Sequence, residues 1–251
     1  MTKEGGIGPK KRLAIAVPTY NEAANLPILI ARLTKVLGNK PLPVTILIID
    51  DNSPDGTGAL ADEFSRRKPA PNVRIEVLHR KKKAGLGAAY MAGMAYLMRK
   101  NYSHILTMDA DLSHNPKHIP ALLRAADSAE LVVGSRYIPG GRTADWPWYR
   151  KFLSWSGNFY ARLVLGWQIH DYTGGFNLYA VPLLSELDIT SMRANGYEFQ
   201  IELKCRALRA KSTIAEVPIT FVDRRNGVSK IPRVTIIKSF VLVPKLRLRL
   251  L

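Results

Sequence analysis

Two carboxylates one residue apart, Asp109 and Asp111, are the side chains of this chain best suited to hold a metal ion. They follow the apolar run His104–Met108, which predicts a short strand. Ligands of an open α/β sheet bind beyond the carboxyl ends of its strands, where this pair would lie. Carboxylate oxygens suit Mg²⁺ or Mn²⁺, and such an ion can take up the charge of a diphosphate. The pair is consistent with cleavage of a nucleotide-sugar bond, although the same spacing also occurs in solvated turns.

A second polar loop follows another predicted strand, Val44–Ile49. It reads Asp-Asp-Asn-Ser-Pro-Asp-Gly-Thr over residues 50–57, a composition typical of turns. Adjacent carboxylates at a strand end could also accept hydrogen bonds from the N1–H and amine of a guanine. In a parallel sheet this loop would lie close to the end of the first strand and to Asp109. Both interpretations, a structural turn and a base-binding loop, stay open at this point.

The first predicted strand, Leu13–Val17, runs into the segment 18–22, Pro-Thr-Tyr-Asn-Glu. Neither the glycine-rich turn of a dinucleotide-binding unit nor a P-loop is present there. Tyr20 could lie against a nucleobase or ribose, and Glu22 could accept hydrogen bonds from ribose hydroxyls. The alternative is an ordinary helix start with Asn21 as its N-cap.

The elements that must position these loops alternate along the chain. Further strands are predicted at residues 73–78 and 131–135, and helices at 23–37, 57–67, 86–100, 116–126, 150–165 and 197–210. The alternation predicts an α/β fold, a Rossmann-like, mostly parallel sheet with helices on both faces. A long loop, Tyr137–Tyr149, interrupts it, and extended segments at 176–180 and 213–222 follow. We expect one catalytic domain, residues 1–232, and a distinct C-terminal segment, residues 233–251.

Composition narrows the classes of partner. Lys+Arg number 37 against 20 Asp+Glu, a formal net charge of +17 over 251 residues. Such a balance predicts attraction to phosphorylated substrates, anionic membranes or nucleic acid. The single cysteine, Cys205, excludes an internal disulfide and fits a reducing compartment. The N-terminal residues lack the apolar core of a signal peptide, and no apolar stretch has the roughly 18 residues of a transmembrane helix.

The end of the chain, residues 236–251, mixes apolar side chains with four cations, and Pro244 interrupts a continuous helix there. A basic amphipathic segment of this kind can lie in a membrane interface. It can equally pack on the domain as a terminal helix, and the sequence does not choose between the two.

Several segments together resemble family 2 glycosyltransferases of the GT-A fold, and more narrowly the polyprenol (dolichol) phosphate mannose synthases. The matching segments are PTYNE at 18–22, DDNSPDGT at 50–57, MDADLSH at 108–114, GSRY at 134–137, GG at 140–141, WPWYR at 146–150, GGF at 174–176 and RRNGVSK at 224–230. They cover about residues 13–232. No single segment is decisive, but their order and spacing are specific.

The resemblance implies roles at matching positions. Binding of the donor GDP-mannose is implied for Pro18, Tyr20, Glu22, Ile49, Asp51, Asp109, Ala110, Asp111, Arg136, Arg150, Arg224 and Lys230. The first five of these would bind guanosine, and Ala110 would lie close to the nucleotide. Catalytic roles are implied for Asp111, Arg136, Arg224 and Lys230.

The same resemblance implies a Mg²⁺ or Mn²⁺ ion held by Asp109 and Asp111, with Ser113 as a further ligand. Two positions depart from the family pattern. Ser113 stands where relatives often have the longer Gln. Asn177 follows Gly-Gly-Phe where relatives often carry Arg, so the acceptor side would have one cation fewer.

Arg136, Arg150, Arg224 and Lys230 match positions that contact donor or acceptor phosphates in the family. Guanidinium groups form fork-shaped, charge-assisted bonds to phosphate oxygens. Any one of them could be surface charge in so basic a chain, but four in matching motifs favour phosphate binding. The run Lys81–Lys83 is ambiguous between donor phosphates, an anionic bilayer and plain solvation.

The implied reaction moves mannose, with inversion, from GDP-mannose to a polyprenyl monophosphate, giving polyprenyl phosphate β-mannose and GDP. The acceptor arrives ionised, because a phosphomonoester has a second pKa of about 6, so no general base is required. We expect a peripheral enzyme at the cytoplasmic face of a membrane, held by its C-terminal segment, its tryptophan loop or a membrane-anchored partner protein. The loop Tyr137–Tyr149 is a candidate lid, with Gly140 and Gly141 allowing closure.

Tryptophans flank this candidate lid. Trp146 and Trp148 could meet isoprene units or the membrane interface, where Trp is favoured. Trp155, by contrast, is predicted to pack in the core.

Three alternatives accompany this interpretation. One keeps the fold and uses UDP-glucose or another nucleotide sugar. One takes the net charge at face value and proposes a basic nucleic-acid-binding or membrane-binding protein, but no nucleic-acid-binding motif is present, so no nucleic-acid partner is expected. The last is an inactive scaffold, which the intact Asp109, Asp111, Arg136, Arg224 and Lys230 disfavour.

Overall fold

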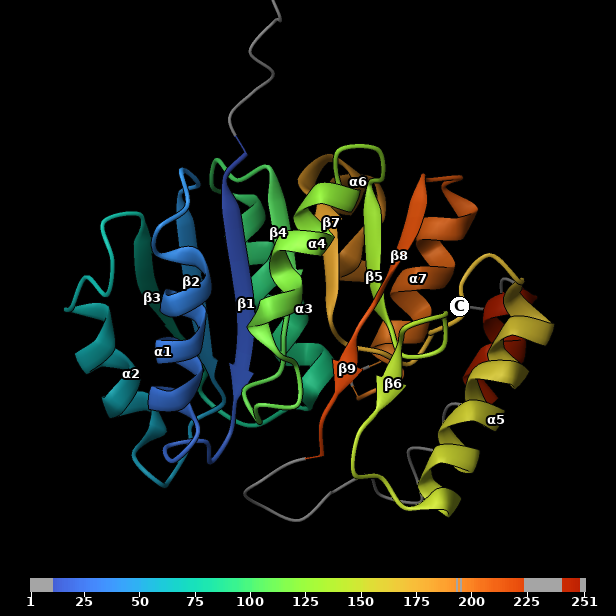
Figure 1. Ribbon diagram of the computed structural model, residues 1–251, viewed down its shortest axis with the longest axis horizontal. Helices are drawn as coiled ribbons and strands as arrows, with labels where there is room; N and C mark the ends of the chain where they lie inside the picture. Colours follow the sequence, from blue (N-terminus) through green and yellow to red (C-terminus); the bar gives the residue numbers. More distant parts are fainter. Residues whose placement is uncertain (1–10, 193, 195, 224–240, 249–251) are drawn as a thin grey trace, which may run out of the picture.

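The computed structural model describes residues 11–192, 194, 196–223 and 241–248 (Figure 1). Its centre is a seven-stranded sheet in the order β3-β2-β1-β4-β7-β5-β8. These strands are β1 (Leu13–Thr19), β2 (Val44–Asp50), β3 (Val73–His79), β4 (His104–Thr107), β5 (Leu131–Ser135), β7 (Asn177–Ala180) and β8 (Ile214–Pro218). Only β7 runs antiparallel to its neighbours in this sheet. The predicted α/β fold with a mostly parallel sheet is confirmed.

Helices cover both faces of the sheet. They are α1 (Leu26–Leu37), α2 (Thr57–Ser65), α3 (Leu86–Met98), α4 (Ile119–Ala125), α5 (Trp148–Leu165), α6 (Val181–Glu186) and α7 (Phe199–Arg209), with 3₁₀ turns η1 (Pro116–His118) and η2 (Ile189–Ser191). Side chains alternate along each strand. In β1, Leu13, Ile15 and Val17 pack in one core with α1, α2 and α4, whereas Ala14 and Ala16 pack in the other with α3, α6 and α7. Figure 1 shows these two helical layers on either side of the strands.

Three local features differ from the sequence-based expectations. The predicted loop Tyr137–Tyr149 contains a short strand, β6 (Arg142–Thr143), which pairs parallel with β9 (Thr220–Phe221). The helix α6 was not predicted. The first helix starts at Leu26 and not at residue 23, because the preceding turn, with Asn21 at φ +60°, is used to bind the neighbouring loop.

The described end of the chain packs on the domain. Residues 241–247 are helical, and Val243 and Leu246 are buried in the core that also holds α7. Val241 and Leu248 are exposed. Within the described ranges, no helix is both long enough and apolar enough to cross a bilayer.

Candidate active site

The loops after β1 and β2 are bonded to one another, as the order of the strands requires. The backbone N–H groups of Asn21, Glu22 and Ala23 donate to Ser53 Oγ (3.1 Å), Thr57 Oγ1 (2.9 Å) and Asp55 Oδ2 (3.1 Å), respectively. β1 also lies next to β4, which ends at the carboxylate pair. The expected proximity of these three strand ends is therefore confirmed.

A tyrosine and a lysine meet at this edge. The Nζ of Lys83 lies 3.7 Å from the centre of the Tyr20 ring, an arrangement typical of a cation–π contact. Glu22 accepts a hydrogen bond from Asn25 Nδ2 (2.7 Å). The exposed Lys83 thus lies over one face of the ring that was predicted to contact the nucleoside.

Asp51 forms an ion pair that the sequence did not reveal. Its carboxylate accepts from Arg80, and both side chains are largely buried. Burial raises the pKa of Asp51, while Arg80 opposes that rise. Of the other predicted guanosine contacts, Pro18 and Ile49 are buried within their strands, and the Ile49 side chain fills the space left by Gly93 on α3.

The carboxylate pair is held by hydroxyl groups. Tyr90 on α3 donates to Asp109 Oδ1 at 2.7 Å, and Ser113 donates to Asp111 Oδ1 at 2.5 Å. Burial and the nearby negative charges raise the Tyr90 pKa well above its usual range, so this hydroxyl stays a donor. Between Asp111 and Ser113, Leu112 adopts φ +66°, which is rare for a side chain of this size. This strained turn brings the Ser113 N–H within 3.1 Å of Asp111 Oδ1.

His114 stabilises the same turn through a hydrogen bond and a ring contact. Its Nδ1 accepts from the Asp109 N–H (3.1 Å), and its ring stacks on Phe176 at 5.1 Å. Burial lowers the His114 pKa, so the ring is neutral and Nδ1 can accept. His114 therefore fixes the backbone of the first carboxylate.

Asp109 and Asp111 suit a Mg²⁺ or Mn²⁺ ion whose other ligands come from water and substrate. Asp109 is half-buried and Asp111 is 5% exposed. Among the residues that the structure describes, no group of three or more acidic, histidine or cysteine side chains could hold an ion. Mg²⁺ usually binds one or two carboxylates and keeps water and substrate phosphates as its other ligands. Ala110, between the two carboxylates, is buried at 3% exposure.

A buried ion pair forms the next part of the edge. Arg136 donates to Asp171 through Nε and Nη2, both at 2.7 Å, and through its backbone N–H at 3.0 Å. Asp171 is fully buried; although burial raises its pKa, the charge and hydrogen bonds of Arg136 bring it down to about 2. The predicted phosphate ligand Arg136 is thus already paired, and its guanidinium also lies over the Trp146 and Phe221 rings.

Lys204 on α7 holds the loop that carries Asp171. It is fully buried, and its Nζ donates to the carbonyls of Asp171 (2.9 Å), Tyr172 (3.1 Å) and Gly174 (2.6 Å). Burial lowers its pKa to about 7. Neither Lys204 nor Asp171 was singled out from the sequence. No local signal in the sequence marks Lys204, because α7 carries other polar side chains beside it, among them Glu202 and Arg206.

Gly175 keeps a small space open beside the carboxylate pair. A Cβ at this position would lie 3.5 Å from Gln200 Nε2, 3.6 Å from His114 Cε1 and 3.8 Å from Asp109 Oδ2. Asn177 donates to Gln200 Oε1 at 3.0 Å, which orients that amide. Gln200 is 3% exposed, and its Nε2 has no hydrogen-bond partner among the described residues. Asn177, the departure from the family pattern, therefore positions an amide donor near Asp109.

The remaining predicted cations are placed differently. Arg150 donates from Nη1 to both oxygens of Asp223 at 2.8 Å and lies 4.1 Å from the Trp146 ring centre. Arg224 and Lys230 lie outside the described residues. The prediction that Trp155 packs in the core is wrong, since Trp155 is 51% exposed, whereas Trp146 is buried.

The candidate lid is closely packed where its glycines lie. A Cβ on Gly141 would lie 2.6 Å from the Ser135 carbonyl oxygen, and Gly140 has φ +88°. These glycines are therefore needed for the turn itself, whatever movement the loop makes.

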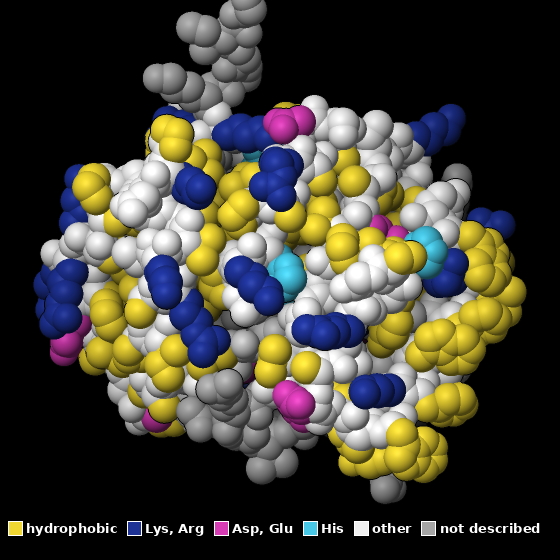
Figure 2. All heavy atoms as spheres, viewed as in Figure 1, with side chains coloured by type: hydrophobic (Ala, Val, Ile, Leu, Met, Phe, Trp, Pro, Cys, Tyr) yellow, Lys and Arg dark blue, Asp and Glu magenta, His cyan; other side chains and the backbone are white. Residues whose placement is uncertain are grey.

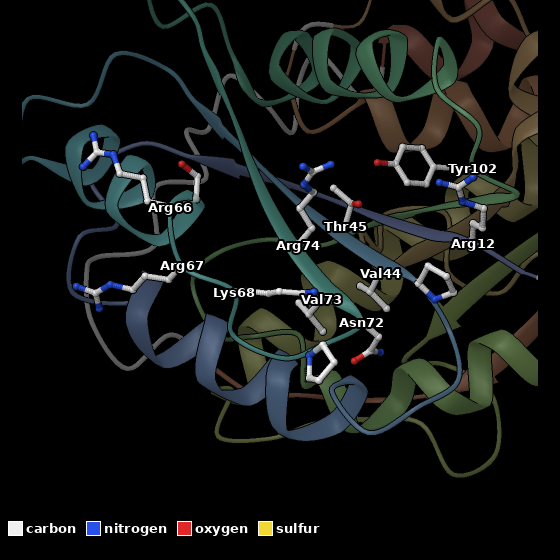
Figure 3. Close-up of a pocket in the computed structure, with 13 residues that line it drawn as sticks. Arg12, Val44, Thr45, Arg66, Arg67, Lys68, Asn72, Val73, Arg74 and Tyr102 are labelled. Atoms are coloured by element: carbon white, nitrogen blue, oxygen red, sulfur yellow. The ribbon is translucent and has the colours of Figure 1, made fainter.

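A pocket of about 530 Å³ opens beside Arg136. Its lining combines cations and aromatic rings: Arg136, Tyr137, Arg142, Thr143, Lys151, Phe152 and Trp155. A larger cavity, about 730 Å³, lies at the amino ends of β2 and β3 (Figure 3). Several of its lining residues are basic, including Arg12, Arg66 and Arg74, and none is acidic. This larger cavity lies at the opposite ends of the strands from Asp109 and Asp111. We therefore place the candidate active site beside the smaller pocket.

Known proteins resemble this chain in both sequence and fold. It is 46% identical over 225 residues to the polyprenol monophosphomannose synthase of Mycolicibacterium smegmatis, covering 89% of this chain and 82% of that protein. It is 41% identical over 219 residues to the undecaprenyl-phosphate mannosyltransferase of Micrococcus luteus, covering 87% of each.

Solved structures share the fold at low sequence identity. Glucosyl-3-phosphoglycerate synthase from Mycobacterium tuberculosis with Mn²⁺, UDP and glucosyl-3-phosphoglycerate has a TM-score of 0.67 at 17% identity, covering 95% of this chain and 80% of that one. The same enzyme with Mg²⁺ and UDP has a TM-score of 0.63 at 18% identity, covering 93% and 79%.

Fold and site together define a glycosyltransferase with the GT-A fold. Residues 14–188 match the family model described as Glycosyl transferase family 2. The chain belongs to glycosyltransferase family 2. The family, the fold and the enzyme class predicted from the sequence are confirmed.

Proposed function

We propose that the enzyme moves mannose from GDP-mannose to a polyprenyl monophosphate, giving polyprenyl phosphate β-mannose and GDP, with Mg²⁺ or Mn²⁺ as cofactor. The carboxylate pair Asp109 and Asp111, at the edge between the bonded β1 and β2 loops and the pocket beside Arg136, carries this proposal. The names of the two relatives support mannose as the sugar and a polyprenyl phosphate as acceptor. Solved neighbours with Mn²⁺ or Mg²⁺ and UDP support a metal and a nucleoside diphosphate in this fold.

Asp109 and Asp111 would hold the metal ion, with Ser113 as a proposed further ligand. When bound, the ion supplies positive charge to the leaving diphosphate. Tyr90 and Ser113 restrain the two carboxylates before the ion arrives, which lowers the reorganisation needed on binding. Ala110, whose backbone connects the two aspartates, would lie against the nucleotide.

The donor nucleoside would lie at the β1 and β2 loops. Tyr20 offers a ring face, and Lys83 beside it would approach the donor phosphates. Glu22 would accept from ribose hydroxyls and Asp51 from guanine, with Pro18 and Ile49 shaping the site from within their strands. Asp51 can accept because the neighbouring Arg80 stabilises its charged form.

The acceptor phosphate would occupy the pocket beside Arg136. Arg142 and Lys151 bring positive charge to its lining, while Phe152 and Trp155 bring aromatic surface for the first isoprene units. Arg150, Arg224 and Lys230 are proposed as further phosphate contacts. This combination of cations and rings fits a lipid phosphate better than a free sugar, which would need more neutral hydrogen-bonding groups.

The reaction needs one displacement. An acceptor phosphate oxygen attacks C1 of mannose as the bond from C1 to the GDP oxygen breaks, so the configuration at C1 inverts and GDP leaves with the electron pair. No proton must be removed, since the acceptor is mostly dianionic at neutral pH, with a second pKa of about 6. Arg136, Arg224 and Lys230 would act in this step by placing positive charge where the diphosphate becomes more negative, and Asp111 would act by holding the metal ion that does the same.

Location and loop movement complete the proposal. A lipid acceptor would bring the enzyme to a membrane, directly or through a membrane-anchored partner protein, and the proposed donor GDP-mannose, which is made in the cytoplasm, would make this the cytoplasmic face. The loop Tyr137–Tyr149 would close over the bound donor. Protection of this loop from protease by GDP-mannose with Mn²⁺ is expected, and equal nicking with and without them would contradict closure.

The test of the proposed function is transfer of radiolabel into the organic phase. Purified enzyme is incubated with Mn²⁺, a short polyprenyl phosphate in detergent, and labelled GDP-mannose or labelled UDP-glucose. We expect label to move from GDP-mannose only. Transfer from UDP-glucose alone would replace the donor, and transfer from neither would contradict the proposed function.

A further inference from the structure

The helix α5 presents most of its large apolar side chains to solvent. Eight of the eleven large hydrophobic residues that are exposed in the described parts of the chain lie within residues 148–167. We call them the aromatic face: Trp148, Tyr149, Phe152, Leu153, Trp155, Phe159, Leu163 and, just past the helix, Trp167. Figure 2 shows the hydrophobic side chains gathered where Figure 1 places α5. So concentrated an exposed apolar surface indicates a binding surface.

The side of α5 that faces the protein is less aromatic, and its larger apolar side chains, Tyr160, Val164 and Leu165, are only partly buried against the core. Asn158 and Ala161 are the residues of this helix that are buried. Asn158 accepts from the Thr173 N–H (3.1 Å) and donates to the Ser154 carbonyl (2.9 Å). A surface helix of a water-soluble domain normally has the reverse arrangement. The apolar face of α5 is therefore suited to contact something other than the core of this protein.

The rings of the aromatic face are already ordered. Phe152, Trp155, Phe159 and Trp167 follow one another with centroid distances of 6.4, 5.4 and 6.0 Å. Exposed fractions of 42–62% for these four side chains leave much of their area available. A preformed row of rings loses little conformational freedom when it is buried.

We propose that this aromatic face lies in the interface of an anionic phospholipid bilayer; the proposal rests on the proposed lipid acceptor. Between residues 146 and 170 the chain has Arg150, Lys151 and Arg162 and no acidic residue. Trp and Tyr favour the headgroup region, and basic side chains are drawn to anionic lipids. A second copy is a poorer occupant, since a symmetric dimer would place these cations opposite their own counterparts.

The location of the face explains how a lipid acceptor would reach the site. Lys151, Phe152 and Trp155 belong to α5 and also line the pocket beside Arg136. With α5 at headgroup depth, this pocket opens near the phosphate layer of the bilayer. A polyprenyl phosphate could then enter it while its hydrocarbon chain stays among the lipid tails.

Intrinsic fluorescence reports directly on this face, because three of the four tryptophans, Trp148, Trp155 and Trp167, belong to it. The enzyme is titrated with vesicles of phosphatidylcholine alone or with phosphatidylglycerol, some carrying brominated acyl chains. We expect a blue shift, quenching by the brominated lipid, and tighter binding to the anionic vesicles. Absence of binding, or a concentration-dependent dimer that shields the tryptophans without lipid, would overturn the proposal.

Two matched substitutions test the location. Leu163→Glu places a charge on the aromatic face away from the pocket, whereas Ile28→Glu places the same charge on α1, where Ile28 is 41% exposed. Since Leu163→Glu removes an apolar side chain from the face and would place a charge in the interface, it should weaken vesicle binding at least about tenfold. Ile28→Glu should change it by less than about twofold. Equal effects of the two substitutions would overturn the assignment to α5.

The proposed function is tested separately with a short, water-soluble prenyl phosphate in the absence of vesicles. Leu163→Glu should transfer mannose to it at the rate of the unmodified enzyme and should be slower only with long acceptors in vesicles. Vesicle binding without any transfer would contradict the proposed function and leave the membrane surface intact. Equally slow transfer from Leu163→Glu in both assays, with unchanged vesicle binding, would overturn the membrane role.

Discussion

Replacing Asp171 with asparagine should destabilise the enzyme strongly, because it leaves the Arg136 guanidinium buried without its counter-charge. Asp171 is 0% exposed and Arg136 8%. A pKa of about 2 in place of 3.8 makes ionised Asp171 worth about 2 kcal/mol of stability. This contribution is present above the unfolded pKa of 3.8 and is lost as the pH falls through about 2. The stranded arginine adds to the loss, and breaking one side of a buried pair costs about 3–5 kcal/mol in total.

Urea denaturation at neutral pH measures the loss directly, and a thermal melt should fall by about 10 °C for a chain of this size. The matched control is Asp223→Asn, which removes the partner of Arg150. Those two side chains are 32% and 20% exposed, so solvent screens the pair and we expect a loss below about 1 kcal/mol. If Asp171→Asn lost no more stability than Asp223→Asn, the buried pair would not have the structural role that we assign to it.

A double substitution separates structure from chemistry at the same position. Asp171→Leu with Arg136→Met replaces the pair by apolar side chains and should recover the part of the lost stability that comes from an unpaired buried charge, although the N–H groups of Arg136 and Gly174 lose their acceptor. Transfer activity should stay low, because Arg136 is proposed to contact the phosphates. A stable double variant with full activity would remove Arg136 from the proposed catalytic residues.

Three further substitutions test the site. Tyr90→Phe removes the hydroxyl bonded to Asp109 and should weaken Mn²⁺ activation about 10–100-fold, measured by titrating transfer activity with the metal; unchanged activation would contradict this support role. Burial lowers the Lys204 pKa from 10.5 to about 7. Between these two pH values the unfolded chain binds more protons than the folded enzyme, so the free energy of unfolding should rise with pH over this range. Denaturation at two pH values should show this rise in the unmodified enzyme and not in Lys204→Met. Gly175→Ala adds a methyl group at ordinary contact distance from Gln200, so the melting temperature should stay nearly constant while kcat falls.

The main strands were accessible from the sequence for a simple physical reason. Strands buried on both faces must be apolar throughout, and the runs at β1 and β2 stand out for that reason. Once the strands are known, polar residues at their carboxyl ends must meet at one edge, which brings Tyr20, Asp51 and Asp109 together. The short β6 and β9 pair left no such signal, because two residues have no periodicity.

The supports of the site could not be predicted, because they depend on contacts between distant segments. Lys204 donates to the carbonyl of Asp171, which lies 33 residues before it in the chain. Arg136 pairs with Asp171 over a separation of 35 residues. Nothing local distinguishes such side chains from surface charge. The prediction that Trp155 packs in the core fails because the apolar face of its helix points outward.

The central claim is metal-assisted mannose transfer at the carboxylate pair, and Asp111→Asn tests it most directly. This change keeps the shape of the side chain and removes its charge. The measurement is the rate of label transfer from GDP-mannose to polyprenyl phosphate, with Mn²⁺ or with chelator, for both proteins. The account predicts transfer by the unmodified enzyme that requires Mn²⁺ and a rate at least about a hundredfold lower for Asp111→Asn. Equal rates for the two proteins, or full activity in chelator, would contradict it.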